Sequence, residues 1–82
     1  MLTIKVLGPG CANCKRLEAL TRAVIAELGL EARIEKVEDL DAIMAYPILA
    51  TPALVINERV VCSGRVPSRT EIAQWLSVSE KA

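Results

Sequence analysis

The chain has 82 residues, a hydrophobic share of 52%, and ten basic against ten acidic side chains, so its formal net charge is zero. This length allows a single domain, near the size at which one core only just outweighs chain entropy. Neutral charge, no basic run and only two aromatic side chains argue against DNA or RNA as a partner. The apolar stretches are too short to span a membrane, and the beginning lacks a secretory signal pattern. We therefore expect a cytoplasmic protein without a membrane partner.

The first part of the chain predicts a strand followed by a long helix. Apolar and polar residues alternate after Met1, which is typical of a strand with one buried face. Gly8-Pro9-Gly10 ends this strand, and from about Ala12 apolar residues recur at helical spacing. Gly29 is well placed as the C-terminal cap of that helix.

The middle of the chain repeats this order on a smaller scale. Residues 31–37 mix apolar and charged side chains at roughly alternate positions, which predicts a second strand. Residues 39–45 predict a short helix that Pro47 ends. The order up to this point is βαβα.

Two short strands, 53–56 and 59–62, are expected to form a hairpin with its turn near Asn57-Glu58. Asn57 tolerates a left-handed backbone, whereas Glu58 suits that conformation poorly.

The last element predicted is a helix. Ser68 and Glu71 form a capping-box pattern, and the apolar stripe that follows includes Trp75, which we interpret as a core anchor. Residues 77–82 are expected to form a frayed tail. Without a repeat or a linker, all elements share one core, and residues 1–82 form one domain.

Two cysteines, Cys11 and Cys14, stand where the first strand gives way to the first helix. A helix N-terminus carries partial positive charge and unpaired N–H groups, and both stabilise a thiolate. Three cysteines do not suit a framework of structural disulfides, and a Cys11–Cys14 bridge closes too small a loop to add much stability. We therefore predict reactive or metal-binding cysteines.

Four features that together span nearly the whole chain carry a family resemblance. They are GxGCxxC after the first strand, Thr51-Pro52 before the third, the short hairpin, and SGRVPSxxEI leading into the last helix. The chain is similar to the small thioredoxin-like "redox-active disulfide" proteins, which have a glutaredoxin-sized thioredoxin fold. The resemblance implies an α/β fold of order βαβαββα, with a four-stranded mixed sheet, helices on both faces and the CxxC exposed at one edge.

The same resemblance implies a cis peptide bond between Thr51 and Pro52, in a loop beside the cysteines that offers backbone groups to an extended thiol substrate. Only X-Pro bonds adopt the cis form at modest cost, and proline is common at the start of a strand. Thr51 and Pro52 are thus the expected substrate-binding residues.

A thiol-disulfide oxidoreductase is the function that we predict from these features, with Cys11 as the nucleophile and the more shielded Cys14 as the resolving thiol. Its partners are a protein or small disulfide and an unidentified reductase, and no cofactor is expected. The intervening Ala12-Asn13 is neither the Gly-Pro usual in thioredoxins nor the Pro-Tyr usual in glutaredoxins. The direction of exchange depends on the reduction potential, which is sensitive to these two residues, so the sequence specifies neither the partner nor the direction. Polar Thr3 and Lys5 occupy the strand that carries a buried acid in thioredoxins, so proton relay by a buried carboxylate is not expected in that form.

Soft-metal binding by the same CxxC is the alternative. GPGCANCKRLEAL also resembles the loop and helix of heavy-metal-associated domains, in which two thiolates hold copper(I). That family runs βαββαβ, however, and Pro9 replaces its methionine, so copper or metalloid transfer is the second hypothesis. A four-ligand zinc site is not expected, because the chain has no histidine and three cysteines.

Two further residues have alternative interpretations. Lys5 either helps to hold the thiolate or is a solvated surface lysine, which is the more common case. Cys62 is either a small buried hydrophobe on the fourth strand or a third thiol near the pair.

Overall fold

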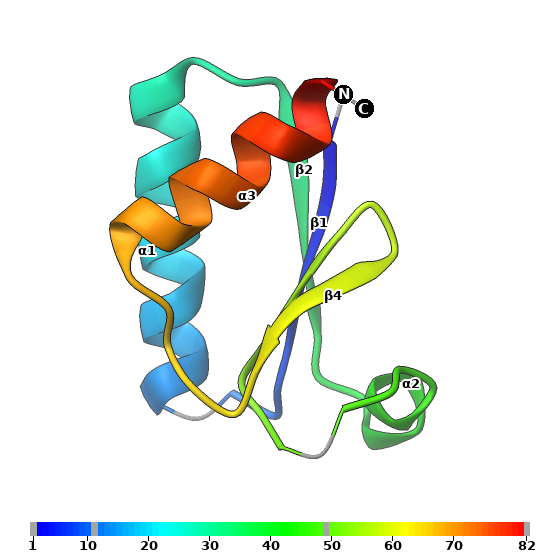
Figure 1. Cartoon of the computed structure of the whole chain (residues 1–82). Helices are drawn as coiled ribbons and strands as arrows, with labels where there is room; N and C mark the ends of the chain where they lie inside the picture. Colours follow the sequence, from blue (N-terminus) through cyan, green and yellow to red (C-terminus); the bar gives the residue numbers. More distant parts are fainter. Residues whose placement is uncertain (1, 11, 49, 82) are drawn as a thin grey trace.

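In the computed structural model, a central sheet separates two helical layers (Figure 1). The structure describes residues 2–10, 12–48 and 50–81, with side chains described up to residue 79. The elements in chain order are β1 (Leu2–Leu7), α1 (Ala12–Leu28), β2 (Ala32–Val37), α2 (Leu40–Met44), β3 (Ala53–Ile56), β4 (Arg59–Ser63) and α3 (Arg69–Lys81). This is the order βαβαββα that the sequence predicts, and the bounds agree to within one or two residues except at the last helix.

The sheet is mixed, with strand order β2-β1-β3-β4. β1 pairs in parallel with β2 and antiparallel with β3, and β3 pairs antiparallel with β4. Figure 1 shows α1 and α3 on one side of the sheet and α2 on the other. The four-stranded mixed sheet with helices on both faces is therefore confirmed.

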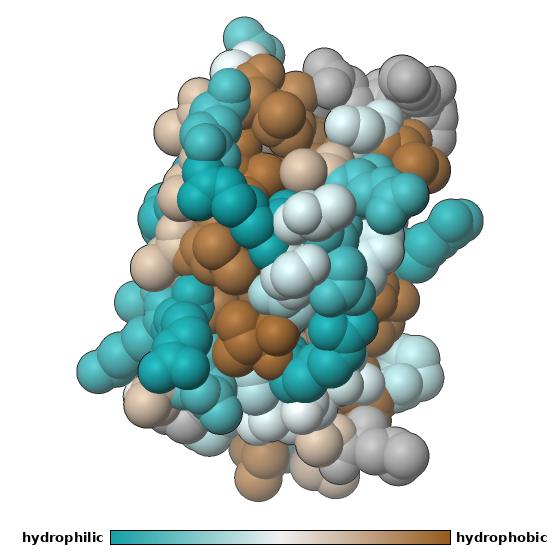
Figure 2. Space-filling model, turned by 60° about the vertical axis from the view of Figure 1, so that its left-hand side comes forward, coloured by the Kyte–Doolittle hydropathy of each residue, from teal (hydrophilic) through white to brown (hydrophobic). Residues whose placement is uncertain are grey.

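The main core lies between the sheet and the α1/α3 layer. Alternate residues of β1 and β3 point to this side, where they meet the apolar stripes of both helices. The buried members are Leu2, Ile4, Val6, Leu17, Val24, Leu54, Ile56, Cys62, Ile72 and Leu76. Trp75 packs against this cluster, in agreement with its predicted role as an anchor. On the outer surface, hydrophilic side chains separate the apolar areas of this face (Figure 2).

A smaller cluster lies on the α2 side of the sheet. Its buried members are Leu7, Ile43, Ala53 and Val55. Because β3 is buried on both faces, its four residues contribute alternately to the two clusters. One five-residue helix covers this face, so the second core is limited to what Ile43 and the following loop can reach.

The hairpin turn is tied to β1. Asn57 and Glu58 both have positive φ, 50° and 65°, as a two-residue type I′ turn requires. The Asn57 side chain accepts a hydrogen bond from the Thr3 backbone N–H at 3.0 Å, and the Asn57 N–H donates to the Thr3 carbonyl at 2.7 Å. Glu58, the residue poorly suited to this backbone, accepts hydrogen bonds from Lys5 at 2.6 Å and from the Tyr46 hydroxyl at 3.2 Å.

The last helix begins at the predicted capping box. The Ser68 hydroxyl accepts from the Glu71 N–H at 3.2 Å, and the Glu71 carboxylate accepts from the Ser68 N–H at 3.1 Å. α3 then continues to Lys81, through most of the segment for which the sequence predicts a frayed tail. Within the part of the chain that the structure describes, no helix combines the length and apolar character needed to cross a membrane.

Candidate active site

Cys14 lies in the first turn of α1 with its side chain directed into the protein. The residue is 5% exposed and disulfide-bonded in the structure. Its burial matches the shielded position predicted for a resolving thiol. Cys11, the predicted nucleophile, lies outside the described residues.

Gly8 follows β1 and makes room for the Cys14 sulfur. A Cβ placed on Gly8 would overlap that sulfur and would lie 3.2 Å from the Cβ of Cys14. The Gly8 N–H donates to the Val37 carbonyl at 3.0 Å, which holds this backbone in line with β2. A side chain at position 8 would therefore force this backbone or the Cys14 sulfur to shift, and glycine avoids the overlap.

The Thr51-Pro52 loop meets Gly8 from the other side. The Thr51 Cβ lies 3.8 Å from the same point at which a Gly8 Cβ would stand, so Thr51 and the Cys14 sulfur are neighbours across this glycine. The peptide bond between Thr51 and Pro52 is cis. Pro52 is buried, and its carbonyl accepts a hydrogen bond from the Gly64 N–H at 2.9 Å. The fold therefore brings together three of the four residues predicted from the sequence, Cys14, Thr51 and Pro52.

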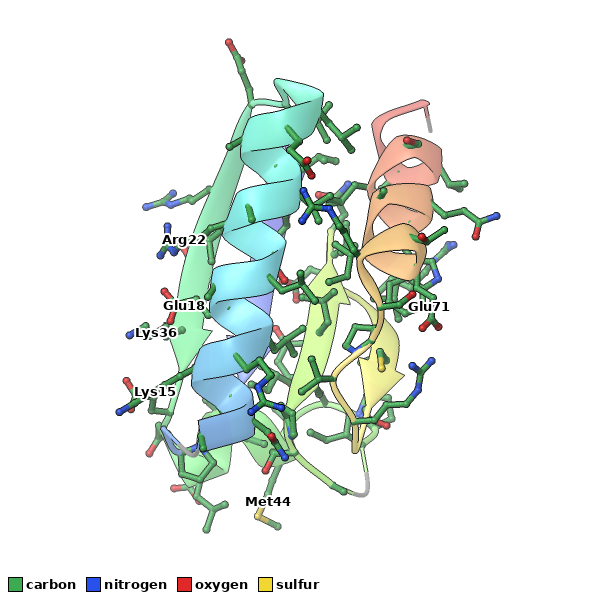
Figure 3. The ribbon with its side chains drawn as sticks, turned by 90° about the vertical axis from the view of Figure 1, so that its left-hand side faces the viewer. Lys15, Glu18, Arg22, Lys36, Met44 and Glu71 are labelled. Carbon is green, nitrogen blue, oxygen red and sulfur yellow. The ribbon has the colours of Figure 1, made fainter. Side chains whose placement is uncertain are left out.

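A small pocket of about 60 Å³ opens on the other side of Cys14, between α1 and β2. Its lining combines apolar and backbone surface with four charged side chains; the lining residues are Val6, Gly8, Gly10, Cys14, Lys15, Glu18, Lys36 and Glu38. Figure 3 shows Lys15, Glu18 and Lys36 along one edge of α1 and β2. This volume exceeds the ~10–15 Å³ that one water molecule requires, and the lining offers polar partners to such a water.

Glu18 is the most enclosed charge of this pocket, with a side chain that is 15% exposed. It accepts a hydrogen bond from Arg22 at 2.9 Å and forms an ion pair with Lys36 at 3.2 Å. The Arg22 guanidinium, assisted by Lys36, lowers the pKa of the Glu18 carboxyl. Glu18 is therefore ionised at neutral pH, and it fixes the Lys36 ammonium at the pocket beside Cys14.

The two residues with alternative interpretations lie apart from this pocket. Lys5 donates to the Tyr46 hydroxyl at 2.9 Å and to Glu58 at 2.6 Å, and the hydrogen bond to Glu58 is the main cause of its raised pKa. Its ammonium thus forms an ion pair with Glu58 at the surface on the α2 side of the sheet, which agrees with a surface lysine better than with a thiolate partner.

Cys62 is a buried member of the main core, 7% exposed, and desolvation raises the pKa of its thiol. It is a free cysteine, which agrees with its interpretation as a small hydrophobe. Among the described residues, no group of three or more His, Cys, Asp or Glu side chains is arranged to hold a metal ion.

Sequence reasoning missed Gly8, Glu18 and Lys36. The position of Glu18 near Cys14 could have been predicted, because Glu18 stands one helical turn after Cys14 and shares its side of α1. To predict the place of Lys36, one must know the strand pairing, since the parallel register of β1 and β2 sets Lys36 opposite Val6. The role of Gly8 could be found only from the packing, because the sequence does not say which glycine of the loop lies next to the Cys14 sulfur.

Comparisons with known proteins identify the family of this chain. A family model described as a thioredoxin domain matches residues 2–77. A thioredoxin of Methanothermobacter thermautotrophicus is 39% identical over 77 residues, covering 94% of this chain and all of the relative. A thioredoxin of Methanocaldococcus jannaschii is 32% identical over 76 residues, covering 93% of this chain and 87% of the relative.

A solved structure has the same fold. The crystal structure of the germline-specific thioredoxin Deadhead from Drosophila melanogaster superposes with a TM-score of 0.65 at 17% identity, covering 94% of this chain and 79% of that one. The chain belongs to the thioredoxin family and is a thiol-disulfide oxidoreductase.

Proposed function

We propose that the chain reduces or forms disulfides by exchange through Cys11 and Cys14, with Thr51 and Pro52 holding the partner. The observation that carries this proposal is the meeting of the Cys14 sulfur and Thr51 across Gly8. A loop in this position can align an extended segment of a partner beside the cysteine pair.

Exchange proceeds in two displacements. The Cys11 thiolate attacks one sulfur of the partner disulfide, a Cys11–partner bond forms, and the partner's other sulfur leaves as a thiolate that takes up a proton. Cys14 then loses its proton and attacks the Cys11 sulfur, which closes the Cys11–Cys14 disulfide and releases the second partner thiolate. The partner gains two electrons and the cysteine pair loses two. The reverse sequence oxidises a partner dithiol.

The burial of Cys14 supports its proposed part in the second displacement. Because the residue is only 5% exposed, an external disulfide has little access to it, whereas a partner bound to Cys11, three residues earlier in the chain, would be attacked intramolecularly. A buried thiol ionises poorly without help, because desolvation disfavours the thiolate. The pocket that Cys14 lines together with Lys36 and Glu18 has room for water and polar partners to hold it, which supports a path for the Cys14 proton.

The test is a pair of serine variants. We expect Cys11→Ser to abolish reduction of a generic protein disulfide, since no nucleophile remains. We expect Cys14→Ser to accumulate a mixed disulfide, detected by mass spectrometry after acid quenching, because the resolving step is lost. Cys62→Ala is the matched control and should retain normal turnover, since Cys62 belongs to the core. Unchanged turnover in either serine variant would contradict the proposal.

Copper(I) or metalloid binding by the same CxxC is the competing outcome. Stoichiometric copper(I) binding that survives a strong chelator, together with no disulfide reduction, would favour it over exchange. The unidentified reductase and the cytoplasmic location expected from the sequence stay predictions.

A further inference from the structure

Three polar side chains on the α2 side of the sheet form a closed set of hydrogen bonds, which we call the Tyr46 network. Lys5 donates to the Tyr46 hydroxyl at 2.9 Å and to one carboxylate oxygen of Glu58 at 2.6 Å. The Tyr46 hydroxyl donates to the other oxygen of Glu58 at 3.2 Å. The Lys5 ammonium also lies 5.7 Å from the centre of the Tyr46 ring, within the range of a cation–π contact. Each group therefore binds the other two.

Two members of the Tyr46 network are fixed by the sheet. Lys5 is a residue of β1, which pairs with a strand on either side, and Glu58 belongs to the hairpin turn. Asn57, the residue before Glu58, forms two hydrogen bonds with the Thr3 backbone, and these tie the turn to β1. The Tyr46 hydroxyl thus meets partners whose backbone is held by strand pairing.

Tyr46 begins the segment that leads to the substrate-binding residues predicted from the sequence, and it stands five residues before Thr51. Its carbonyl accepts a hydrogen bond from the Ile48 N–H at 2.8 Å, and both residues pack against the smaller core cluster. At the other end of the segment, the Pro52 carbonyl accepts from the Gly64 N–H at 2.9 Å. The position of Tyr46 therefore sets where the chain enters the Thr51-Pro52 loop.

Glu58 is an unfavourable choice for the turn itself. Its φ is 65°, and a type I′ turn prefers asparagine followed by glycine, so the glutamate side chain costs free energy here. The ion pair with Lys5 offsets little of that cost, because the Glu58 side chain is 64% exposed and solvent screens it. Departures from local rules are expected at functional sites. What this carboxylate adds is a fixed position for the Tyr46 hydroxyl.

We propose that Tyr46 is a positioning residue for disulfide exchange, held by Lys5 and Glu58 so that the Thr51-Pro52 loop is ordered before a partner binds. This inference rests on the proposed function, in which that loop holds the partner. A loop that is already ordered loses less conformational entropy on binding, so an extended partner binds at a lower concentration. The Tyr46 network thus acts on partner binding and not on the chemical steps at the cysteine pair.

Kinetics with a synthetic peptide that contains one intramolecular disulfide test the proposal. The reduced protein is mixed with excess peptide in single-turnover reactions, which give a half-saturating concentration and a limiting rate. We expect Tyr46→Phe to raise the half-saturating concentration about fivefold, the size of one net hydrogen bond, while the limiting rate stays close to that of the unchanged protein. The rate constant with neutral hydroxyethyl disulfide, which is too small to need the loop, should not change.

Glu58→Gly separates positioning from stability. It supplies the asparagine–glycine order that this turn prefers and removes the carboxylate from the Tyr46 network. We expect a melting temperature no lower than that of Glu58→Gln, together with the same rise in half-saturating concentration as in Tyr46→Phe. Lys5→Arg keeps the charge and the donors, so its half-saturating concentration should be lower than that of Lys5→Met, which keeps neither.

Glu27→Gln is the matched control. It removes an exposed ion pair with Arg69 that joins α1 and α3 on the opposite side of the sheet, and it should change neither kinetic constant. Thermal melts verify folding, and since Tyr46→Phe and Glu58→Gly test the same contact from two sides, one folded variant is sufficient.

Three outcomes decide against the proposal. A half-saturating concentration in Tyr46→Phe or Glu58→Gly equal to that of the unchanged protein or of Glu27→Gln would overturn it. An equal loss of rate with hydroxyethyl disulfide would also overturn it, because the change would then lie at the cysteine pair. If the unchanged protein reduces neither disulfide, the proposed function itself fails and the positioning role falls with it.

Discussion

The two faces of the sheet are built differently. On the α1/α3 face, two helices and alternate residues of β1 and β3 enclose a continuous apolar core. On the α2 face, a five-residue helix covers a small cluster around Ile43. Tyr46 packs against this cluster and also forms hydrogen bonds with Lys5 and Glu58. The first face supplies most of the stability, because burial of apolar surface is the main favourable contribution to folding.

The candidate active site lies where these faces meet. Cys14 belongs to α1, Thr51 follows the α2 segment, and Gly8 separates them. The well-packed layer encloses Cys14, while the thinly covered layer leaves Leu40 and Met44 exposed at a groove that Thr51 also lines. This division predicts different consequences for changes on the two sides.

The largest expected effect is a cavity in the main core. Leu17→Ala should lower the free energy of unfolding by about 3–4 kcal/mol, because a fully enclosed leucine leaves a void that two helices and a sheet cannot fill. Ile43→Ala should cost about 2 kcal/mol, near the lower end of such changes, since a short surface helix can settle into the gap. Urea unfolding of both variants measures the contrast, and equal losses would contradict the difference between the faces.

Gly8→Ala should change the candidate active site, where the two faces meet, more than it changes the packing of either face. The added methyl group overlaps the Cys14 sulfur and displaces it, and a displacement of about 1 Å at a reacting atom can cost about 10²-fold in rate. The measurement is the rate at which Cys14 resolves a preformed mixed disulfide on Cys11. The stability cost of Gly8→Ala should largely disappear in a Cys14→Ala background, and a full cost there would mean that some other contact requires glycine.

On the α1/α3 side, acid should weaken the start of α3. Hydrogen bonds from the Arg65 guanidinium, at 2.7 and 3.0 Å, and from the Ser68 N–H lower the pKa of Glu71 to about 2. Since this pKa is below the ordinary value of 4.5, the contribution to stability is present above pH 4.5 and is lost as the pH falls towards 2. The difference in melting temperature between the unchanged protein and Glu71→Gln should shrink over this range. A difference that does not depend on pH would rule out the charge as its source.

The smallest effect is expected at the polar contact on the α2 side. Lys5 lowers the pKa of Glu58 mainly through their hydrogen bond, so the ionised carboxylate stabilises the fold at neutral pH, and this contribution is lost on acidification. Glu58→Gln should lower the melting temperature by less than Glu71→Gln, since the Glu58 side chain is 64% exposed and solvent screens the pair. Glu31→Gln, on an exposed residue, is the control. A loss of stability equal to that of Leu17→Ala would contradict the small contribution that we expect from the α2 face.

Much of the fold follows from local patterns. Alternation in β1, the apolar stripe of α1, Gly29 with a φ of 65° after it, and the Ser68–Glu71 box are local rules, and the structure agrees with each. The exception is Glu58, whose side chain disfavours a positive φ when considered alone. Its hydrogen bonds to Lys5 and Tyr46 accompany that backbone, and they join segments far apart in the sequence.

By itself the sequence determined the element order and the candidates Cys11 and Cys14, because spacing and turn residues are local properties of the chain. Its resemblance to small thioredoxin-like proteins added the fold class and the candidates Thr51 and Pro52. Only the tertiary structure decided that Thr51 and the Cys14 sulfur meet at Gly8, that Lys36 reaches Glu18, and that Leu40 and Met44 border a groove. Those relations depend on strand register and on which helix covers which face. Both are set by long-range packing, which no local pattern encodes.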